Sequence, residues 1–181
     1  MRSGTIDLVK GFRPGDDARA TKSRRLTLEL LDGTRAPFDR TTFDPGHITA
    51  SALVLSPRRD RVLLVYHRRL ERWLQPGGHV EPTDVDVVAT AQREVLEETG
   101  LVVTKRDMPL VGVDVHDIPP AGDEPAHLHH DLMFGTTARA EEVDRTSLEP
   151  MAVWCAVSDL DRYGIDVPLR RALERALHPS Q

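Results

Sequence analysis

The stretch Trp73–Leu101 reads W-L-Q-P-G-G-H-V-E-P-T-D-V-D-V-V-A-T-A-Q-R-E-V-L-E-E-T-G-L, and the rest of the chain is organised around it. A Gly-Gly turn leads into a segment with the pattern of a helix. Thr83, followed three residues later by Asp86, predicts a helix start similar to a capping box. Gly100 favours a helix end at Thr99, because glycine readily adopts the left-handed conformation that closes a helix.

Three glutamates of this helix are expected to lie on one side of it. A helix advances by ~100° per residue, which brings Glu94, Glu97 and Glu98 together. Val87 and Ala91 fall on the same stripe, so this face begins apolar and becomes acidic in its last two turns. A merely solvated face would not normally include two apolar residues.

Carboxylates crowded on a half-buried face repel one another unless a cation lies between them. Oxygen ligands suit hard ions such as Mg²⁺ or Mn²⁺, which commonly bridge carboxylates to phosphates. In isolation, R-E-x-x-E-E would more often be the solvated end of a surface helix, with Arg93 paired to Glu97. The Gly-Gly turn before it and the Thr-Gly stop after it favour a functional site.

The segment Gly78–Leu101 resembles the Nudix box, G-x5-E-x7-R-E-U-x-E-E-x-G-U, in which U is aliphatic. The matching residues are Gly78, Arg93, Glu94, Val95, Glu97, Glu98, Gly100 and Leu101. One residue is inserted in the first half, so the upstream glutamate of the box falls on Asp84 or on Val85, depending on the end from which one counts. Asp84 and Asp86 are both candidates for that acid.

The resemblance implies an α/β fold, namely a Nudix-type α/β/α sandwich with a mixed sheet, here with an N-terminal extension. We expect residues 47–181 to form the Nudix hydrolase domain and residues 1–46 to pack on it or flank it. The implied activity is the hydrolysis of a diphosphate bond in a nucleoside diphosphate linked to another moiety, such as a small nucleotide or nucleotide sugar, with Mg²⁺ or Mn²⁺. Divalent ions held by carboxylates can neutralise phosphate oxygens and activate water.

Within the box, Glu94 and Glu98 lie one helical turn apart and are expected to bind the metal directly. Glu97 would share a second ion or orient water, and the resemblance implies a further ligand from the carbonyl of Gly78. Arg93 is expected to orient the acids through its pairing with Glu97. One of these glutamates could be the general base. The family often takes the base from a later loop, where the candidates are Glu141, Glu142 and Glu149.

A basic and aromatic cluster precedes the box and is a candidate substrate-binding region. Trp73 could stack on a base, and Arg69, close to His67, could pair with a phosphate. The alternative is equally simple, with Trp73 in the core and the arginine in solvent.

Histidines further along the chain suggest a second kind of metal site. His127, His129 and Asp131 alternate, so they would share one face of a strand, with His130 on the other. Two histidines and an aspartate could bind zinc or iron. His129 and its neighbours could instead be the polar lining of a substrate cleft.

Composition and charge exclude several classes of protein. The net charge is −5, from 29 acidic and 24 basic residues, so stable nucleic-acid binding is not expected. No apolar run approaches the ~20 residues that span a bilayer, and the first residues lack a signal-peptide pattern. The single cysteine, Cys155, is expected in a buried strand, and a cytoplasmic location fits. A homodimer is possible.

The remaining segments predict a mixed order of strands and helices. Residues 1–17 are polar and are expected to form a loosely held arm. Residues 17–31 favour a helix that ends near Gly33, although the alternation from Leu26 to Leu30 also permits a strand. Several strands, the helix of the box and a helix near the C-terminus follow. A small-nucleotide hydrolase is the leading hypothesis.

Two other functions remain open at this stage. A catalytically silent Nudix-fold nucleotide-binding or sensor module would bind without cleaving, and the irregular position of Asp84 is the feature that favours it. A zinc-type enzyme built on the histidine strand would lose activity in His129→Ala but keep it in Glu98→Gln.

Overall fold

The computed structural model describes residues 1–104, 108–141 and 151–178. The strands are β1 (Gly46–Leu55), β2 (Arg61–His67), β3 (Arg72–Leu74), β4 (Gly77–His79), β5 (Leu110–Ile118), β6 (His127–Thr137) and β7 (Ala152–Ala156). The α-helices are α1 (Arg2–Gly11), α2 (Ala18–Gly33), α3 (Val87–Thr99) and α4 (Val167–Leu177). Two 3-10 segments, η1 (Arg68–Leu70) and η3 (Val157–Tyr163), follow β2 and β7. Among the described helices, none has both the length and the apolar character needed to span a membrane.

The strands form one mixed sheet with the main order β3-β2-β1-β6-β5. β1 is the central strand, and all of its residues except the glycine and polar positions belong to the apolar core. It pairs in parallel with β6 and antiparallel with β2 and β4, while β7 pairs with β2. The mixed sheet expected from the sequence is therefore confirmed.

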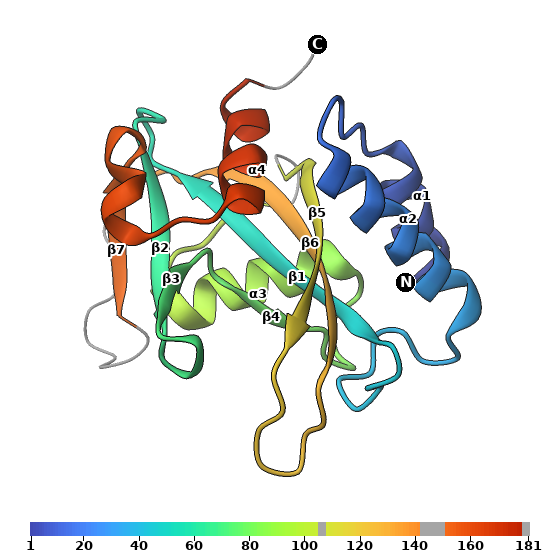
Figure 1. The fold of residues 1–181 in the computed structure, drawn as a ribbon. Coiled ribbons are helices and arrows are strands. Elements are labelled where there is room, and N and C mark those ends of the chain that lie inside the picture. The colour runs from blue at the N-terminus through green and yellow to red at the C-terminus, as the bar shows by residue number, and fades with distance from the viewer. Residues whose placement is uncertain (105–107, 142–150, 179–181) are drawn as a thin grey trace.

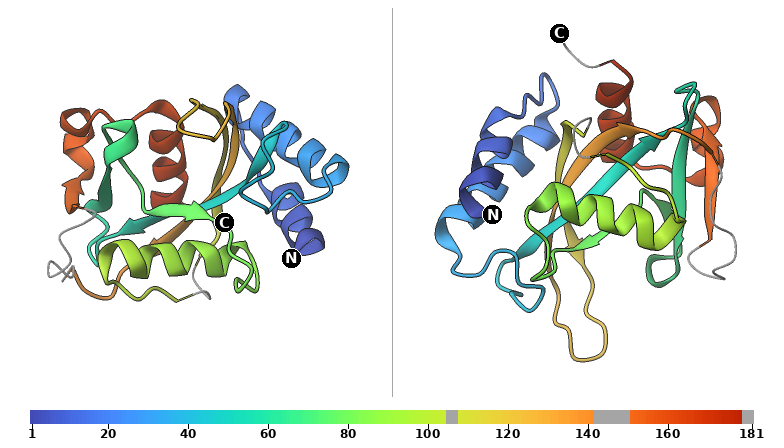
Figure 2. Two further views of the ribbon diagram at one scale, coloured as in Figure 1. Left: turned by 90° about the horizontal axis from the view of Figure 1, so that it is seen from below. Right: turned by 180° about the vertical axis from the view of Figure 1, so that it is seen from behind.

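Helices cover both faces of this sheet (Figures 1 and 2). On one face, α3 buries Val87, Ala91 and Val95 in a cluster that includes alternate residues of β1. On the other face, α4 buries Leu169 and Leu173 in a second cluster. The expected α/β/α sandwich is confirmed.

The first 17 residues are not the loose arm predicted from the sequence. Residues 2–11 form α1, because Thr5, Val9 and Phe12 lie on one stripe and are buried. Asp17 caps α2 by accepting a hydrogen bond from the Ala20 N–H at 2.9 Å. The helix predicted for residues 17–31 is confirmed, and the alternative strand is not formed.

These two helices pack on the sheet on the side of β5 (Figure 1). Phe12 and Leu31 belong to the same apolar cluster as Phe134 of β6. Polar contacts also join the parts: Arg19 pairs with Asp114 of β5 at 2.8 Å. The N-terminal helices thus share one core with the sheet.

Replacing Leu31 with alanine is expected to lower the free energy of unfolding by about 2–5 kcal/mol, because Leu31 is fully buried in this shared core. Urea unfolding followed by the fluorescence of Trp73 and Trp154, which lie in the sheet, should show a lower midpoint. Glu29→Ala, at a side chain of α2 that is 55% exposed, is the control and should change stability by less than about 0.5 kcal/mol. An unchanged tryptophan midpoint in Leu31→Ala would mean that α2 unfolds independently of the sheet.

Helix α3 begins later than the sequence predicted. Thr83 is not the N-cap; Asp86 is, and its side chain accepts a hydrogen bond from the Ala89 N–H at 3.0 Å. The capping-box prediction was wrong because Asp86 itself provides the cap. Gly100 ends the helix with φ 72°, as predicted.

Candidate active site

Gly77 and Gly78, which the sequence placed in a turn, instead begin strand β4, which pairs with β1 and lies in close contact with α3. A Cβ atom on Gly78 would lie 2.5 Å from Oε1 of Glu94, and one on Gly77 would lie 2.4 Å from Cβ of Ser51. Gly77 therefore leaves no room for a side chain beside the backbone of β1, and a side chain at position 78 would displace the Glu94 carboxylate. The Glu94 carboxylate lies directly against the backbone that carries the Gly78 carbonyl.

Glu98 lies beside the same strand. Its Oε2 accepts a hydrogen bond from the Gly77 N–H at 3.0 Å. Burial, together with the charges of Glu94 and Glu97, raises the pKa of Glu98 to about 7, although the Gly77 hydrogen bond opposes this. Burial also raises the pKa of Glu94. Two carboxylates thus lie where negative charge is disfavoured, which is the electrostatic condition for a cation site.

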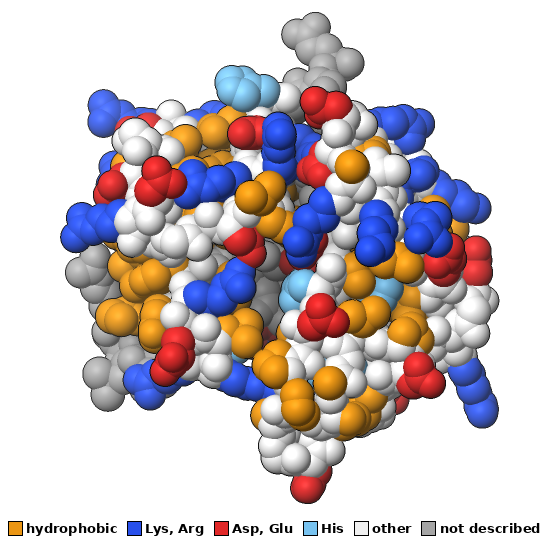
Figure 3. Space-filling view, in the orientation of Figure 1, with side chains coloured by type: hydrophobic (Ala, Val, Ile, Leu, Met, Phe, Trp, Pro, Cys, Tyr) orange, Lys and Arg blue, Asp and Glu red, His pale blue; other side chains and the backbone are white. Residues whose placement is uncertain are grey.

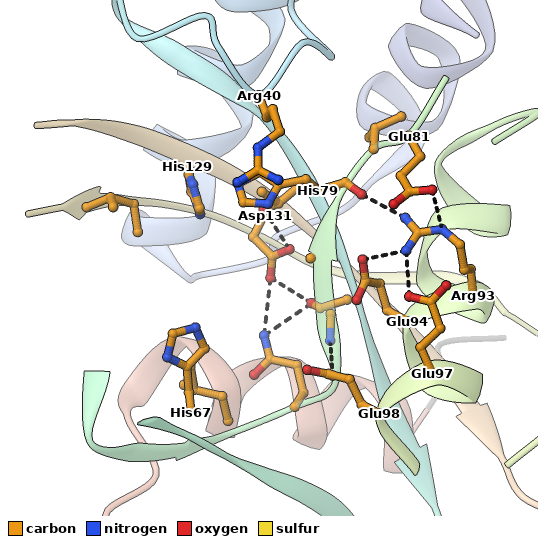
Figure 4. Close-up of a pocket in the computed structure, with 18 of the residues that line it drawn as sticks. Arg40, His67, His79, Glu81, Arg93, Glu94, Glu97, Glu98, His129 and Asp131 are labelled. Atoms are coloured by element: carbon orange, nitrogen blue, oxygen red, sulfur yellow. Dashed lines mark hydrogen bonds and ion pairs between the residues drawn. The ribbon is translucent and has the colours of Figure 1, made fainter. Parts of the chain in front are cut away.

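Arg93 joins the acids of α3 to one another and to β4 (Figure 4). Its Nη1 donates to Glu94 at 2.8 Å and to Glu97 at 3.0 Å. Its Nη2 donates to the carbonyl oxygen of His79 at 2.8 Å. The Arg93 side chain is 18% exposed, so these bonds are mostly shielded from water. The contacts of Arg93 therefore extend beyond the predicted pairing with Glu97.

Asp84 lies on the far side of the same guanidinium. Its two oxygens accept from Nε and Nη2 of Arg93 at 3.2 and 3.0 Å. It also accepts from the Glu81 N–H and the Thr90 hydroxyl, both at 2.9 Å. Burial would raise the pKa of Asp84, but these hydrogen bonds outweigh it and lower the pKa. Asp84 therefore pairs with Arg93 despite the inserted residue, while Asp86 caps the helix.

Arg93 and the three glutamates of α3 line one wall of a cavity of about 890 Å³, whereas Asp84 is not among its described lining residues. Figure 4 shows the acids of α3 on one side of β4, and His67, His129 and Asp131 on the other. In the space-filling view, a hollow at the centre of the face has histidine at its edge and basic side chains around it (Figure 3). Residues 38–40, from the N-terminal extension, also line the cavity, which the sequence did not indicate.

The proposed substrate-binding residues do not all reach this cavity. Arg69 and His67 line it, but Arg69 is held by Glu124 at 3.0 Å and by the Pro119 carbonyl at 2.9 Å. Trp73 is absent from the described lining and packs against aromatic rings, with its centroid 5.3 Å from that of Tyr66.

The structure describes only one of the three candidate bases on the later loop. Glu141 pairs with Arg61 at 2.8 Å and is not among the described residues of the cavity wall. Glu142 and Glu149 lie outside the described residues. The acids of α3 that line the cavity are Glu94, Glu97 and Glu98, joined there by Asp39, Glu81 and Asp131.

The histidine strand differs from the sequence prediction in one member. Asp131 is buried and accepts hydrogen bonds from Thr49 (3.1 Å), Ser51 (2.7 Å) and Gln75 (3.2 Å). The residue grouped with His127 and His129 is His47 of β1. Neither the spacing in the sequence nor the polar pattern indicated His47, because the two strands are far apart in the chain. The predicted other orientation of His130 is confirmed, since its Nδ1 lies 3.1 Å from the Thr27 hydroxyl of α2.

A family model described as the NUDIX domain matches residues 45–176. Because this match covers well over half of the chain, the chain belongs to the Nudix family. It is thus a hydrolase of the class that acts on phosphorus-containing anhydrides. A comparison with curated protein sequences finds no significant match.

Several solved structures share this fold. A mutator MutT protein from Bacillus halodurans is 23% identical, with a TM-score of 0.57 over 74% of this chain and 84% of that one. A Nudix-family hydrolase from Clostridium perfringens is 21% identical, with a TM-score of 0.51 over 75% of this chain and 98% of that one. A Nudix hydrolase from Nitrosomonas europaea is 23% identical, with a TM-score of 0.51 over 72% and 87%. At these identities the similarity concerns the fold.

Replacing Gly78 with alanine is expected to weaken Mn²⁺ binding at least about tenfold, because the new methyl group would displace the Glu94 carboxylate. Titration of the metal-stripped protein with Mn²⁺ by calorimetry measures the change. Gly4→Ala is the matched control, since a Cβ at Gly4 meets nothing within 4 Å. Unchanged Mn²⁺ affinity in Gly78→Ala would contradict a metal site beside Gly78.

Proposed function

We propose that this protein is a Mg²⁺- or Mn²⁺-dependent pyrophosphohydrolase that cleaves a diphosphate bond in a small nucleoside diphosphate derivative, such as a nucleotide or nucleotide sugar. The observation that supports it best is the convergence of Glu94 and Glu98 on Gly77 and Gly78 of β4 at the cavity wall. Both carboxylates are shielded from water, and burial raises the pKa of each.

The donor atoms beside Gly77 and Gly78 fit a hard divalent cation. Glu94, Glu98 and the carbonyl of Gly78 offer oxygen ligands, which Mg²⁺ and Mn²⁺ prefer. When bound, such an ion supplies charge neutralisation for the phosphate oxygens and lowers the pKa of a bound water. Glu97, with a side chain 54% exposed, is free on its outer side to share a second ion or orient water.

Positioning of the acids falls to Arg93. Its five N–H groups are distributed over Asp84, Glu94, Glu97 and the His79 carbonyl, so the guanidinium faces the acids and not the open cavity. The general base then has to come from an acid that reaches the cavity. Glu97 and Glu98 both meet that condition, and we propose Glu97 because Glu98 is the proposed metal ligand, whereas the Glu97 side chain is 54% exposed.

The opposite wall is suited to an anionic substrate. Arg69 and Arg40 approach the cavity from different segments, and both pair with Glu124, at 3.0 and 3.6 Å. A substrate phosphate can replace Glu124 as the partner of either guanidinium. His67 and His129 add neutral donors and acceptors, because burial lowers the pKa of each.

The second candidate function is a catalytically silent nucleotide-binding or sensor module. Its support in the sequence was the irregular spacing before Asp84. In the fold, Asp84 forms a two-point contact with Arg93, so the shorter acid and the inserted residue still complete the pairing. This geometry favours hydrolysis over binding alone.

A substrate panel tests the proposal. Nucleoside triphosphates, dinucleoside polyphosphates and nucleotide sugars are incubated with the metal-stripped protein plus Mg²⁺ or Mn²⁺, and products are followed by ³¹P NMR in ¹⁸O-enriched water. We expect turnover of at least one class only with added metal, with ¹⁸O in one phosphate product. Binding of a nucleotide by calorimetry without turnover of any class would support the silent module.

A further inference from the structure

Four imidazole rings gather on one face of the sheet beside the cavity. In the parallel pairing of β1 and β6, His47 is opposite His129, and His127 lies two residues earlier on the same face of β6. The ring centroid of His47 lies 4.8 Å from that of His129 and 5.0 Å from that of His127. His79 comes from β4, and its centroid lies 5.1 Å from those of His47 and His129.

Three of these rings bring nitrogen atoms close together. One nitrogen each from His47, His127 and His129 lie within 4.8 Å of one another. In a tetrahedral site with metal–nitrogen bonds of about 2.0–2.1 Å, neighbouring nitrogens are about 3.3 Å apart. Binding of an ion would therefore draw the most distant of these nitrogens closer by up to about 1.5 Å.

Hydrogen bonds fix which nitrogen of two rings is available. Nδ1 of His47 lies 3.0 Å from the Thr42 carbonyl oxygen, and Nδ1 of His127 lies 2.8 Å from the Pro125 carbonyl oxygen. Because a carbonyl oxygen only accepts, both Nδ1 atoms carry the hydrogen, and in the neutral rings both Nε2 atoms carry a lone pair. Metal-binding histidines in proteins typically donate their other N–H in this way.

Two buried nitrogen atoms of the cluster lack a hydrogen-bond partner. Nε2 of His47 and Nε2 of His129 are buried and have no hydrogen-bond partner among the described residues. His47 is only 1% exposed. An unsatisfied buried polar atom costs about 1–3 kcal/mol, and ring stacking alone leaves both atoms unsatisfied. A bound cation would satisfy both at once.

We propose that His47, His127 and His129 form a second metal site, which binds a borderline divalent transition-metal ion with Zn²⁺ as the best match. Neutral imidazoles suit Zn²⁺, whereas Mg²⁺ prefers the oxygen ligands of α3. His79 and His129 also line the cavity, so an ion held by these rings would lie beside the cavity wall. Since His79 directly follows Gly78, the ion places positive charge in the wall of the same cavity, where phosphate oxygens would lie. The site does not depend on the proposed hydrolysis.

Calorimetric titration of the full-length, metal-stripped protein with Zn²⁺ tests the site. We expect one tight site per chain, weakened more than about 100-fold in His127→Ala and in His129→Gln. His178→Ala, which removes an exposed histidine at the end of α4, should leave the affinity unchanged. Glu98→Gln should also leave it unchanged, which separates this site from the carboxylate site. Tight Zn²⁺ binding that is lost in Glu98→Gln and kept in both histidine variants would overturn the proposal.

Spectroscopy of the unmodified protein avoids any effect of the substitutions on folding. With one equivalent of Co²⁺ in place of Zn²⁺, we expect the strong visible absorption of a four-coordinate ion. X-ray absorption of the Zn²⁺ form should show nitrogen neighbours at about 2.0–2.1 Å with the outer-shell scattering of imidazole rings. A weak six-coordinate Co²⁺ spectrum together with a shell of oxygen neighbours would contradict the assignment.

Discussion

Glu98→Gln is expected to reduce metal-dependent hydrolysis by on the order of 10³-fold, because it removes a charged oxygen from the ion that neutralises the reacting phosphates. The substitution keeps the size of the side chain, and its amide can still face the Gly77 N–H through the carbonyl oxygen. Steady-state rates on the best substrate of the panel, measured across Mg²⁺ and Mn²⁺ concentrations, report the loss. Full activity in both Glu98→Gln and Glu97→Gln would refute the assignment of the site.

The stability of the same variant shows whether lost activity reflects lost folding. The folded-state pKa of Glu98, about 7, exceeds the ordinary value of 4.5. Such a group stabilises the metal-free fold fully below pH 4.5, and this contribution is lost as the pH rises through 7. Removing the ionisable group should therefore make the metal-free protein more stable than wild type by about 3 kcal/mol at pH 8, with no gain below pH 4.5. Thermal unfolding at both pH values measures this difference.

A further pair of variants separates the carboxylate site from an enzyme built on the histidines. If hydrolysis depends on α3, His129→Ala retains measurable metal-dependent turnover while Glu98→Gln does not. The reverse pattern, with activity kept in Glu98→Gln and lost in His129→Ala, would assign the reaction to the imidazole cluster.

Arg93→Gln is expected to lower the free energy of unfolding by about 3–5 kcal/mol, because it leaves buried carboxylates without their cation. The side chain of Asp84 is 6% exposed and that of Glu94 is 14% exposed, so water cannot replace the guanidinium well. Urea unfolding of the metal-free protein at pH 8 measures the loss. Arg25→Gln is the matched control, since Arg25 pairs with Glu29 on the surface, where side chains are 61% and 55% exposed.

A double substitution sharpens this prediction. Asp84→Asn combined with Arg93→Gln should be less destabilising than the sum of the two single changes, because the pair is removed together. Strict additivity would mean that Arg93 and Asp84 do not interact energetically, and that the loss in Arg93→Gln has another cause.

The helix of the box was the part of the fold that the sequence predicted best, because all of its information is local. Helical phase alone placed Glu94, Glu97 and Glu98 near one another and buried Val87 and Ala91. Helix start signals were less decisive. Thr83 and Asp86 are both of residue types that cap helices, and only the folded structure shows that Asp86 provides the cap.

The features that the sequence did not predict all depend on pairing between distant segments. His47 joins His127 and His129, which lie 80 and 82 residues further along the chain, through the parallel register of β1 and β6. The sequence did not predict α1, because its apolar stripe is short and indicates a helix only when the sheet offers a surface on which it can pack. Trp73 gives the opposite example, since its local neighbourhood suggested a ligand but aromatic neighbours from β2 and η3 surround it.

The shared core of α1, α2 and the sheet has a consequence for how the fold is assembled. The family match begins at residue 45, whereas the apolar cluster already includes Val9 and Phe12. A chain cut back to the matched segment would present to water the apolar surface that the two helices cover, and it would tend to self-associate. In this respect α1 and α2 resemble a binding partner that is covalently linked to the sheet. Because the link makes the association intramolecular, the effective concentration of this interface is set by the chain and does not fall on dilution.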